Sequence, residues 1–460
     1  MEIEKHSIDF IPENERHGRI TDLFTVWFAA NMQLTPLVTG ALAVVLGLDL
    51  GWSVLVIILG NLVGAIFMAY HSAQGPKLGI PQMIQSRAQF GVIGAIIPLI
   101  IVILMYLGFF ASSSVIGAQA LTGLSGGHIT INPAIIILSV VTLAVTIVGY
   151  DLIHAVERWL SVVFAVVFIF VTVKAFSLPL PAGTWSLAHP NWPMVFLTLT
   201  IMVTWQISYA PYVADYSRYL PKNTSIGKTF AYSYAGTVLS SAWMMVLGAV
   251  LTLGIRNFLN NSSTNVAHLF GGGGWALLMF LIVIMGIIAV NVLNLYGAFM
   301  SMTTSLQAVI KMAVNQRTRS SFVIIMAVIG TGLAIIGQGN FLNNFSNFIL
   351  FLAYFLIPWT AINLVDFYFV RHGEYRIADI FKLDGIYRRF NWRTLIVYGI
   401  GILVEVPFMN TTFYTGPIAK AMGGADISWI VGLIISAPLY YVMSRSQAQR
   451  IEFADQTTNP

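Results

Sequence analysis

Long stretches without any charged residue set the strongest limit on how this chain can fold. The stretches 92–121, 229–254, 273–300 and 343–365 contain no Asp, Glu, Lys or Arg. Each exceeds the roughly 20 residues that cross the hydrocarbon core of a bilayer as a helix. Lipid offers no hydrogen bonds, so a spanning segment is a helix or part of a closed barrel, and barrel strands alternate and run only about 10 residues. The sequence therefore predicts an all-α polytopic membrane protein.

Composition agrees with this class and excludes others. Of the 460 residues, 9% are charged and 57% are hydrophobic, whereas roughly a quarter of the residues of a soluble domain are charged. The absence of cysteine excludes disulfides and thiolate metal sites, and no pair of the 8 histidines has metal-ligand spacing. We therefore expect no cofactor and no metal. The polar, acidic N-terminus lacks the basic start and short apolar core of a signal peptide.

The hydropathy pattern predicts twelve transmembrane helices. They cover about 23–47, 52–70, 92–121, 133–149, 159–177, 194–214, 229–254, 273–310, 321–337, 343–369, 394–410 and 427–443. With the N-terminus inside, only Lys174, Arg256 and Lys420 of the 23 Lys and Arg residues fall outside. Cytoplasmic loops retain basic residues, so this split predicts a cell-membrane protein with both termini in the cytoplasm. It also explains the net charge of +5 without a nucleic-acid partner.

Two of the predicted spans contain a polar patch followed by proline. In the first span the patch is Asn31, Gln33 and Thr35, followed by Pro36, and in the sixth it is Thr204, Trp205, Gln206 and Ser208, followed by Pro211. Proline removes a helical hydrogen bond and clashes with the preceding turn, so each patch is expected to interrupt its helix. Many carriers use such broken helices to expose backbone groups to a solute. Ordinary kinked helices with packed amides are the alternative.

The two prolines, 175 residues apart, indicate an internal repeat. We predict a first repeat at 23–177 (spans 1–5), a second at 194–369 (spans 6–10) and two accessory spans at 394–443. Residues 1–22 and 444–460 are expected to be cytoplasmic, and the basic loop 370–393 is expected to lie on the membrane surface.

Polar and aromatic side chains at membrane depth suggest a site for a flat heterocycle. Asn291 and Asn294 lie on one helix face, and carboxamides both donate and accept hydrogen bonds, as the edge of a nucleobase does. Trp205, with Tyr106 and Phe110 one turn apart, supplies aromatic faces. Interhelical packing is the alternative for each of these residues. Among the acidic residues, we expect a structural role for Glu405, and interface roles for Asp215, with Arg218, and for Asp366.

Six stretches resemble one family. They are NERHGRITDLFTVWFAANM (14–32), GPKLGIPQMIQSRAQFG (75–91), GYDLIHAVERW (149–159), ISYAPYVADYSRYLPKNTS (207–225), NVLNLYG (291–297) and IPWTAINLVDFYFVRHGEY (357–375). They resemble the purine–cytosine permease group of the nucleobase–cation symporter family one. The resemblance implies a leucine-transporter-type fold of five-plus-five inverted repeats with two accessory helices. It also implies symport of cytosine, purines, uracil, hydantoins, allantoin or a vitamin precursor.

The same resemblance assigns substrate contacts. It implies that Trp205 stacks on the substrate beside Gln206, and that Tyr106 stands where the family usually has tryptophan. It also implies amide contacts from Asn291 and Asn294, and we add Gln33 from the first polar patch.

The resemblance bears on the coupling ion as well. Sodium-coupled members place a hydroxyl pair opposite carbonyls of the first span, but the matching stretch here reads Asn294-Leu295. Carbonyls around Ala29 and Met32, with Asn291, form only a weak sodium site. Protons are therefore favoured, with sodium left open, and the titratable candidates are Glu405, Asp215 and His154.

Other classes fit less well. An intramembrane enzyme needs a group of catalytic residues at membrane depth, which the spans lack. A channel would give uptake that does not saturate as the solute concentration rises. The remaining alternative is an inverted-repeat transporter of another solute: allantoin or hydantoin, a vitamin precursor or an amino acid. The sequence does not determine the oligomeric state.

Overall fold

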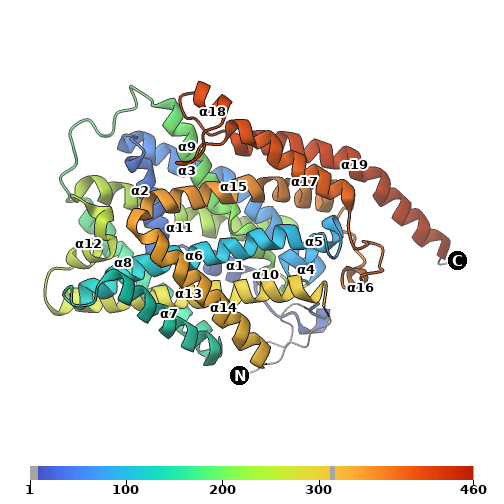
Figure 1. Ribbon diagram of the computed structural model, residues 1–460, viewed down its shortest axis with the longest axis horizontal. Coiled ribbons are helices and arrows are strands. Elements are labelled where there is room, and N and C mark those ends of the chain that lie inside the picture. The colour runs from blue at the N-terminus through green and yellow to red at the C-terminus, as the bar shows by residue number, and fades with distance from the viewer. Residues whose placement is uncertain (1–8, 149, 311–315, 459–460) are drawn as a thin grey trace.

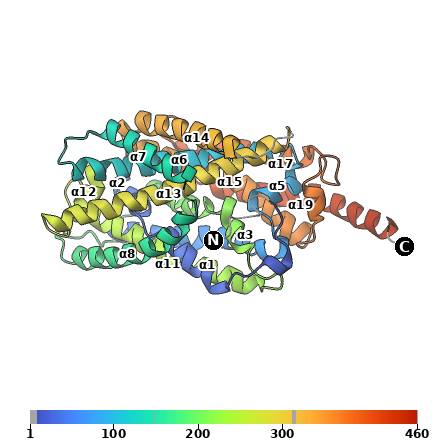
Figure 2. The same ribbon diagram turned by 90° about the horizontal axis from the view of Figure 1, so that it is seen from below.

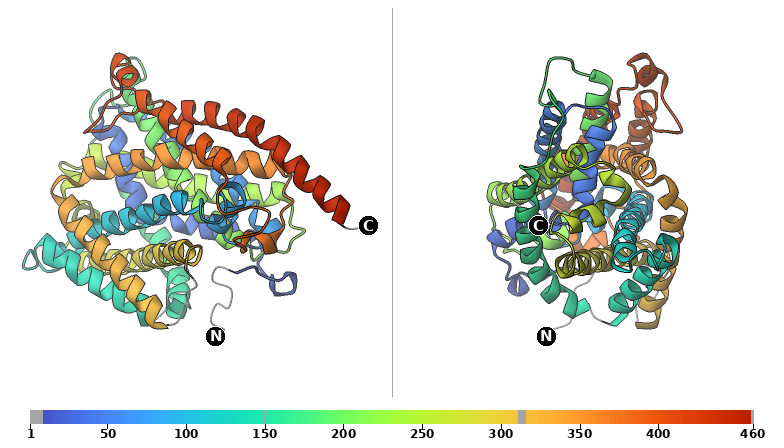
Figure 3. Two further views of the ribbon diagram at one scale, coloured as in Figure 1. Left: turned by 45° about the vertical axis from the view of Figure 1, so that its right-hand side comes forward. Right: turned by 90° about the vertical axis from the view of Figure 1, so that its left-hand side faces the viewer.

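The computed structural model describes residues 9–148, 150–310 and 316–458, and within these ranges all regular secondary structure is helical apart from one isolated bridge between Asn410 and Thr415. The long helices are α3 (Leu50–Ser72), α6 (Ile96–Leu124), α7 (Ile131–Val148), α8 (Tyr150–Ala175), α9 (Trp192–Ile207), α11 (Ile226–Gly254), α13 (Gly274–Gln307), α14 (Gln316–Gly337), α15 (Phe341–Val365), α17 (Trp392–Glu405) and α19 (Ser428–Thr458). They form one elongated bundle (Figure 1), seen from another side in Figure 3. The predicted all-α class is confirmed.

Each of the twelve predicted spans contains a helix, but fewer helices qualify as spans on their own. Six runs in the described ranges are long and apolar enough to cross a membrane, or seven if the bent pair α1 (Ile20–Ala30) and α2 (Leu34–Val45) counts as one. One of these runs, Gln316–Val370, contains both α14 and α15. Helices such as α7 and α17 are shorter. The number twelve therefore stays a prediction.

The first span is broken where the polar patch predicts. Helix α1 ends at Ala30, α2 begins at Leu34, and the two axes differ by 59°. Between them the backbone of Gln33 is extended, with φ −154° and ψ 173°. Pro36 lies in the first turn of α2, where its missing N–H costs no helical hydrogen bond. The helix is therefore interrupted at Asn31–Gln33, ahead of the proline.

The sixth span is interrupted more gently. Helix α9 ends at Ile207, a 3-10 turn covers Ala210–Tyr212 around Pro211, and α10 covers Val213–Ser217. The run Trp192–Ser217 nevertheless qualifies as one span. At the second predicted break the helical hydrogen bonding therefore changes around Pro211.

Glycines bring the broken first span into direct backbone contact with α11. A Cβ atom on Gly40 of α2 would overlap the carbonyl oxygen of Met245, and one on Gly248 of α11 would overlap that of Leu37. Small residues at such crossings let helices approach closely, which is how helices gain contact energy in lipid. Helices α2 and α11 therefore pack as one unit. On another side of the bundle, α7 packs against α6 and α14 (Figure 2).

Part of the loop at 370–393 packs against the rest of the protein. Its only helix, α16, covers Ile377–Ile380, and the side chains of Ile380 and Tyr387 are buried against α4 (Gly75–Leu78) and α5 (Gln82–Phe90). The backbone N–H of Asn391 also donates to the carbonyl of Phe90 at 2.8 Å. The apolar residues of this loop thus pack against other parts of the same chain, which hydropathy alone does not predict.

Candidate functional site

The break in the first span is hydrogen-bonded to the aromatic end of α9. Trp205 is 2% exposed, and its indole N–H donates to Oδ1 of Asn31 at 3.0 Å. The hydroxyl of Tyr209 donates to the same oxygen at 2.9 Å. The amide nitrogen of Asn31 donates in turn to the carbonyl of Trp27 at 3.2 Å and to the hydroxyl of Ser240 at 3.1 Å. Asn31 therefore joins the two interrupted spans and α11.

Aromatic rings from α6, α15 and the segment that follows α9 lie beside Trp205. Phe109 of α6 meets the indole edge-on, with ring centroids 5.8 Å apart, and Phe348 of α15 meets Phe109 at 5.1 Å. Tyr209 lies on another side of the indole at 6.0 Å. Such edge-on pairs are a favoured geometry for aromatic rings. We call Trp205, Phe109, Phe348 and Tyr209 the aromatic cluster.

Tyr106 and Phe110, which the sequence suggested as one pair, lie in different places. The ring of Tyr106 packs against Tyr212 at 5.6 Å and against Gly297 of α13, near the aromatic cluster. Phe110 is fully buried against Gly330 of α14. Phe109 faces Trp205 instead, because one residue turns the side-chain direction by about 100° on a helix. No sequence signal distinguishes Phe109 from Phe110.

The predicted amide pair lies together on α13. Asn294 donates to Oδ1 of Asn291 at 3.4 Å, and Asn291 donates to the hydroxyl of Ser114 on α6 at 2.9 Å. Asn291 is 1% exposed and Asn294 is 9% exposed. One residue from Ser114, the hydroxyl of Ser113 lies 3.4 Å from that of Thr35, beside the broken first span. The α6 serines belong to this polar group, and sequence reasoning missed them.

Gln206 belongs to a polar network that meets the hydrogen bonds of Asn31 at the hydroxyl of Thr237. Its amide nitrogen donates to Asn61 of α3 and to Ser241 of α11, both at 2.7 Å, and its oxygen accepts from Thr237 at 2.7 Å. Its side chain is wholly buried. These contacts hold α3, α9 and α11 together.

The remaining polar-patch residues stay near the break. Gln33 is partly buried, and its amide donates to the carbonyl of Ala30 at 3.0 Å. The carbonyl of Ala29 accepts from the backbone N–H of Met32 at 2.9 Å. The hydrogen bonds of Asn291 run to Ser114 and Asn294 and not to these carbonyls.

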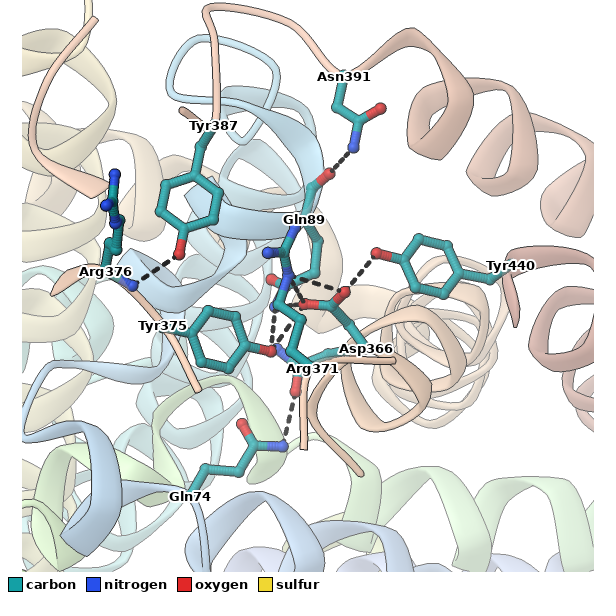
Figure 4. Close-up of polar contacts among 10 residues, drawn as sticks. Gln74, Gln89, Asp366, Arg371, Tyr375, Arg376, Tyr387, Asn391 and Tyr440 are labelled. Carbon is teal, nitrogen blue, oxygen red and sulfur yellow. Dashed lines mark hydrogen bonds and ion pairs between the residues drawn. The ribbon is translucent and has the colours of Figure 1, made fainter. Parts of the chain in front are cut away.

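Asp366, at the start of a π-helical turn, is the centre of a buried polar group shown in Figure 4. Its carboxylate accepts from Gln89 at 2.9 Å, Tyr375 at 2.7 Å, Tyr440 at 2.8 Å and Arg371 at 3.2 Å. Burial and the neighbouring carboxylate raise the pKa of Tyr375 well above its ordinary value, so this phenol remains a donor. The group joins α5, α15 and α19, which fits an anchor.

The other ionisable candidates are spread over the molecule. Asp215 accepts from the backbone N–H of Gln82 at 2.7 Å, and the guanidinium of Arg218 lies over the ring of Tyr219. The side chain of His154 lies outside the described residues. Glu405 is buried at the end of α17.

A helical bundle with a broken first span, tied at its centre to an interrupted sixth span, is the architecture of the leucine-transporter-type secondary transporters. Solved structures agree. A nucleobase-cation-symport-1 family transporter, Mhp1, in a closed conformation with bromovinylhydantoin bound, matches with a TM-score of 0.76 and 19% identity over 97% of this chain and 96% of that one. Its inward-facing conformation matches with a TM-score of 0.79 over 98% and 96%.

The sequence identifies the family. The model of permeases for cytosine/purines, uracil, thiamine and allantoin matches residues 10–432, so the chain belongs to that family and is a membrane transporter, not an enzyme. A putative purine-cytosine permease of Bacillus subtilis, YxlA, is 52% identical over 98% of both chains. The purine-cytosine permease fcyB of Emericella nidulans is 27% identical over 96% of this chain and 88% of its own. The resemblance seen in the sequence is confirmed.

Proposed function

We propose that this permease imports cytosine or a purine across the cell membrane by cation symport with alternating access. The observation that carries the proposal is the joining of an aromatic cluster, centred on Trp205, to the broken first span through Asn31. A solute bound there would contact both interrupted helices at once. Family membership and the 52% identity to a putative purine-cytosine permease support the choice of cargo.

The chemistry of the site suits a planar heterocycle. An aromatic ring offers its face to any base, and stacking on such a ring contributes about 1–3 kcal/mol per base. The edge of the base then needs donors and acceptors in one plane, which the amide of Asn294 can supply. Asn294 has one described hydrogen bond, to Asn291, so most of its amide is available. We assign Trp205, Phe109, Tyr106 and Asn294 to the substrate, with Asn291 and Gln33 beside them.

Two residues that the sequence suggested as substrate contacts, Gln206 and Phe110, have other partners. Gln206 uses its amide nitrogen and oxygen within the network of Asn61, Ser241 and Thr237. Phe110 packs on Gly330. We therefore assign both to the packing that positions the site.

For the coupling ion we propose the proton. A sodium ion needs several oxygen ligands, and the matching stretch Asn294-Leu295 carries no hydroxyl pair. The amide oxygen of Asn291 is the nearest substitute in that region, and it already accepts from Asn294.

We also propose that both termini face the cytoplasm, because basic residues gather in the loops on that side.

Uptake into proteoliposomes tests the function. Purified protein is reconstituted, and labelled cytosine, adenine, uracil and a hydantoin are supplied under an imposed proton or sodium gradient. We expect saturable, gradient-driven uptake of cytosine or adenine, with unlabelled base accelerating exchange. Saturable uptake of the hydantoin alone would replace the proposed cargo. Non-saturable flux that ignores both gradients would contradict a symporter altogether.

A further inference from the structure

A carboxyl group without a hydrogen-bond partner is enclosed where α15, α17 and α19 meet. Glu405 is 0% exposed, and neither of its oxygens has a partner among the described residues. A Cβ atom on Gly432 of α19 would overlap one of these oxygens, and the side chain of Ile357 on α15 lies against the same glycine. The carboxyl group therefore fills the contact between three helices, close to the end of α17.

The groups around Glu405 do not neutralise a negative charge. The charged group that acts on it is another carboxylate, Asp426, which precedes α19. Asp426 is itself buried and accepts from Tyr354 of α15 at 2.7 Å, from the backbone of Asn410 at 2.9 Å and from Ser428. On α17 the nearest titratable group is Tyr398, whose hydroxyl donates at 3.2 Å to a carbonyl of α15. Asp426 thus has several hydrogen-bond donors, whereas Glu405 has none among the described residues.

An ionised carboxylate in this position is strongly disfavoured. Removing it from water without a hydrogen bond or counter-ion costs far more than removing the neutral acid, and the like charge of Asp426 adds to the cost. The neutral acid meets only the smaller cost of an unpaired hydroxyl and carbonyl. The packing of α15 against α17 and α19 therefore requires a proton on Glu405.

The helix that covers Glu405 also touches the aromatic cluster. Residues 341–357 of α15 carry Phe348, which packs on Phe109, and Tyr354, which donates to Asp426. This outer half of α15 ends at Pro358, a proline inside the helix that packs on Gly401 of α17. Proline leaves a carbonyl of the preceding turn without its helical donor, so bending there is easier than elsewhere.

We propose that Glu405 is a proton-binding site on the outer side of the protein, and that its occupancy is required for the outer half of α15 to pack against α17 and α19. When that half tilts away and water enters, the O–H bond of Glu405 breaks and the proton passes to water. When it returns, the carboxylate takes a proton from water again. Because the proton binds one conformation much better than the other, external pH shifts their balance.

This site differs from the coupling-ion site. The proton enters and leaves on the same side, so it is not transported, and the effect is independent of whether sodium or protons drive uptake. The inference rests on the proposed function for its transport readout and on the proposed orientation for the side that it faces.

External pH tests the inference. The initial rate of labelled cytosine uptake is measured for the wild type and each variant at several external pH values with internal pH held constant, so that any dependence due to a coupling proton is common to all of them. For the wild type we expect the rate to fall as external pH rises. Glu405→Gln is permanently neutral and should depend on external pH clearly less than the wild type does, and Glu405→Leu should do the same without an unpaired polar atom. Glu405→Asp should restore a dependence. Glu374→Gln is the matched control, since its side chain is 80% exposed, and should behave as the wild type.

A direct measurement does not need transport. The infrared spectrum of the purified wild-type protein at neutral pH should contain a protonated carboxyl band, shifted in heavy water, that is missing from Glu405→Leu. Absence of this band, or an unchanged pH profile in both Glu405→Gln and Glu405→Leu, would overturn the inference. If the wild type takes up no base at all, the proposed function fails, while the infrared result still decides the protonation of Glu405.

Discussion

Trp205 donates its indole N–H to the side-chain oxygen of Asn31 across 3.0 Å, and these two residues belong to the two spans that are interrupted. The hydrogen bond fixes the plane of the indole relative to the break between α1 and α2. A base that stacks on Trp205 therefore meets a ring whose orientation is already set. Preorganisation of this kind lowers the entropic cost of binding.

Replacement of the indole should separate stacking from hydrogen bonding. Trp205→Ala should weaken substrate affinity by about 1–3 kcal/mol, or roughly 5- to 150-fold, because the stacking surface is lost. Trp205→Phe keeps a ring but leaves Asn31 with only the donor from Tyr209, so a smaller loss is expected. Equilibrium binding of labelled base gives both values. Wild-type affinity in Trp205→Ala would exclude this ring from the site.

The two asparagines of α13 should differ in what they control. Asn294→Ala should change the ranking of bases with little loss of stability, because its described hydrogen bond is a single long one to Asn291. Asn291→Ala removes the partner of Ser114 and should lower stability by about 1–3 kcal/mol. Competition uptake with a panel of bases, together with thermal unfolding in detergent, separates the two effects. An equal loss for all bases in Asn294→Ala would indicate a packing role instead.

Gln206 should act on stability and not on selectivity. Gln206→Leu removes hydrogen bonds to Asn61, Ser241 and Thr237. Asn61 and Ser241 remain bonded to each other, but the hydroxyl of Thr237 loses its acceptor, which costs about 1–3 kcal/mol. We expect a clearly lower Tm, while the folded fraction keeps the wild-type ranking of bases. A changed ranking at unchanged Tm would make Gln206 a substrate ligand.

Gly297 tests the position of Tyr106 without touching its chemistry. A methyl group at Gly297 would overlap the ring of Tyr106, so Gly297→Ala should displace that ring and reduce base affinity. Gly332→Ala on α14 is the matched control, because nothing lies within 4 Å of the added carbon. The KM values for uptake are compared. Similar KM values in the two variants would place Tyr106 outside the substrate contacts.

Ion replacement should distinguish the two coupling ions. We expect accumulation of base to follow an imposed pH gradient and to persist when sodium is replaced by choline. The physical reason is the missing hydroxyl pair near Asn294, since sodium prefers a cage of oxygen ligands. Accumulation that needs sodium and ignores the pH gradient would make Asn291 and the carbonyls of the first break candidate sodium ligands.

The parts of the fold that follow from local chemistry could be predicted from the sequence. Charge-free stretches predict helices because lipid leaves the backbone no other partner, and polar residues before Pro36 predict the break that the structure contains at Asn31–Gln33. The break precedes the proline because Pro36 is tolerated in the first turn of α2. The sixth span shows the limit: Pro211 produces only a 3-10 turn, since the tertiary packing around it decides how far the chain bends.

The site could be predicted only in part, because a side chain's direction depends on neighbours that are distant in sequence. Trp205 and Gln206 are adjacent, yet the first points to Asn31 and the second to Asn61. Phe109 and Phe110 are likewise equivalent in hydropathy, and only the positions of α9 and α14 assign one to Trp205 and the other to Gly330. Residue type gives the chemistry of the site, and helix packing selects its members.

The buried carboxylate of Asp366 has a consequence for biosynthesis. One of its donors, Tyr440, lies 74 residues further along the chain. A ribosome therefore completes eleven predicted spans before the residue that finishes this anchor has been made. A chain that stops short of α19 would retain an acid with an incomplete set of donors at the junction of α5 and α15.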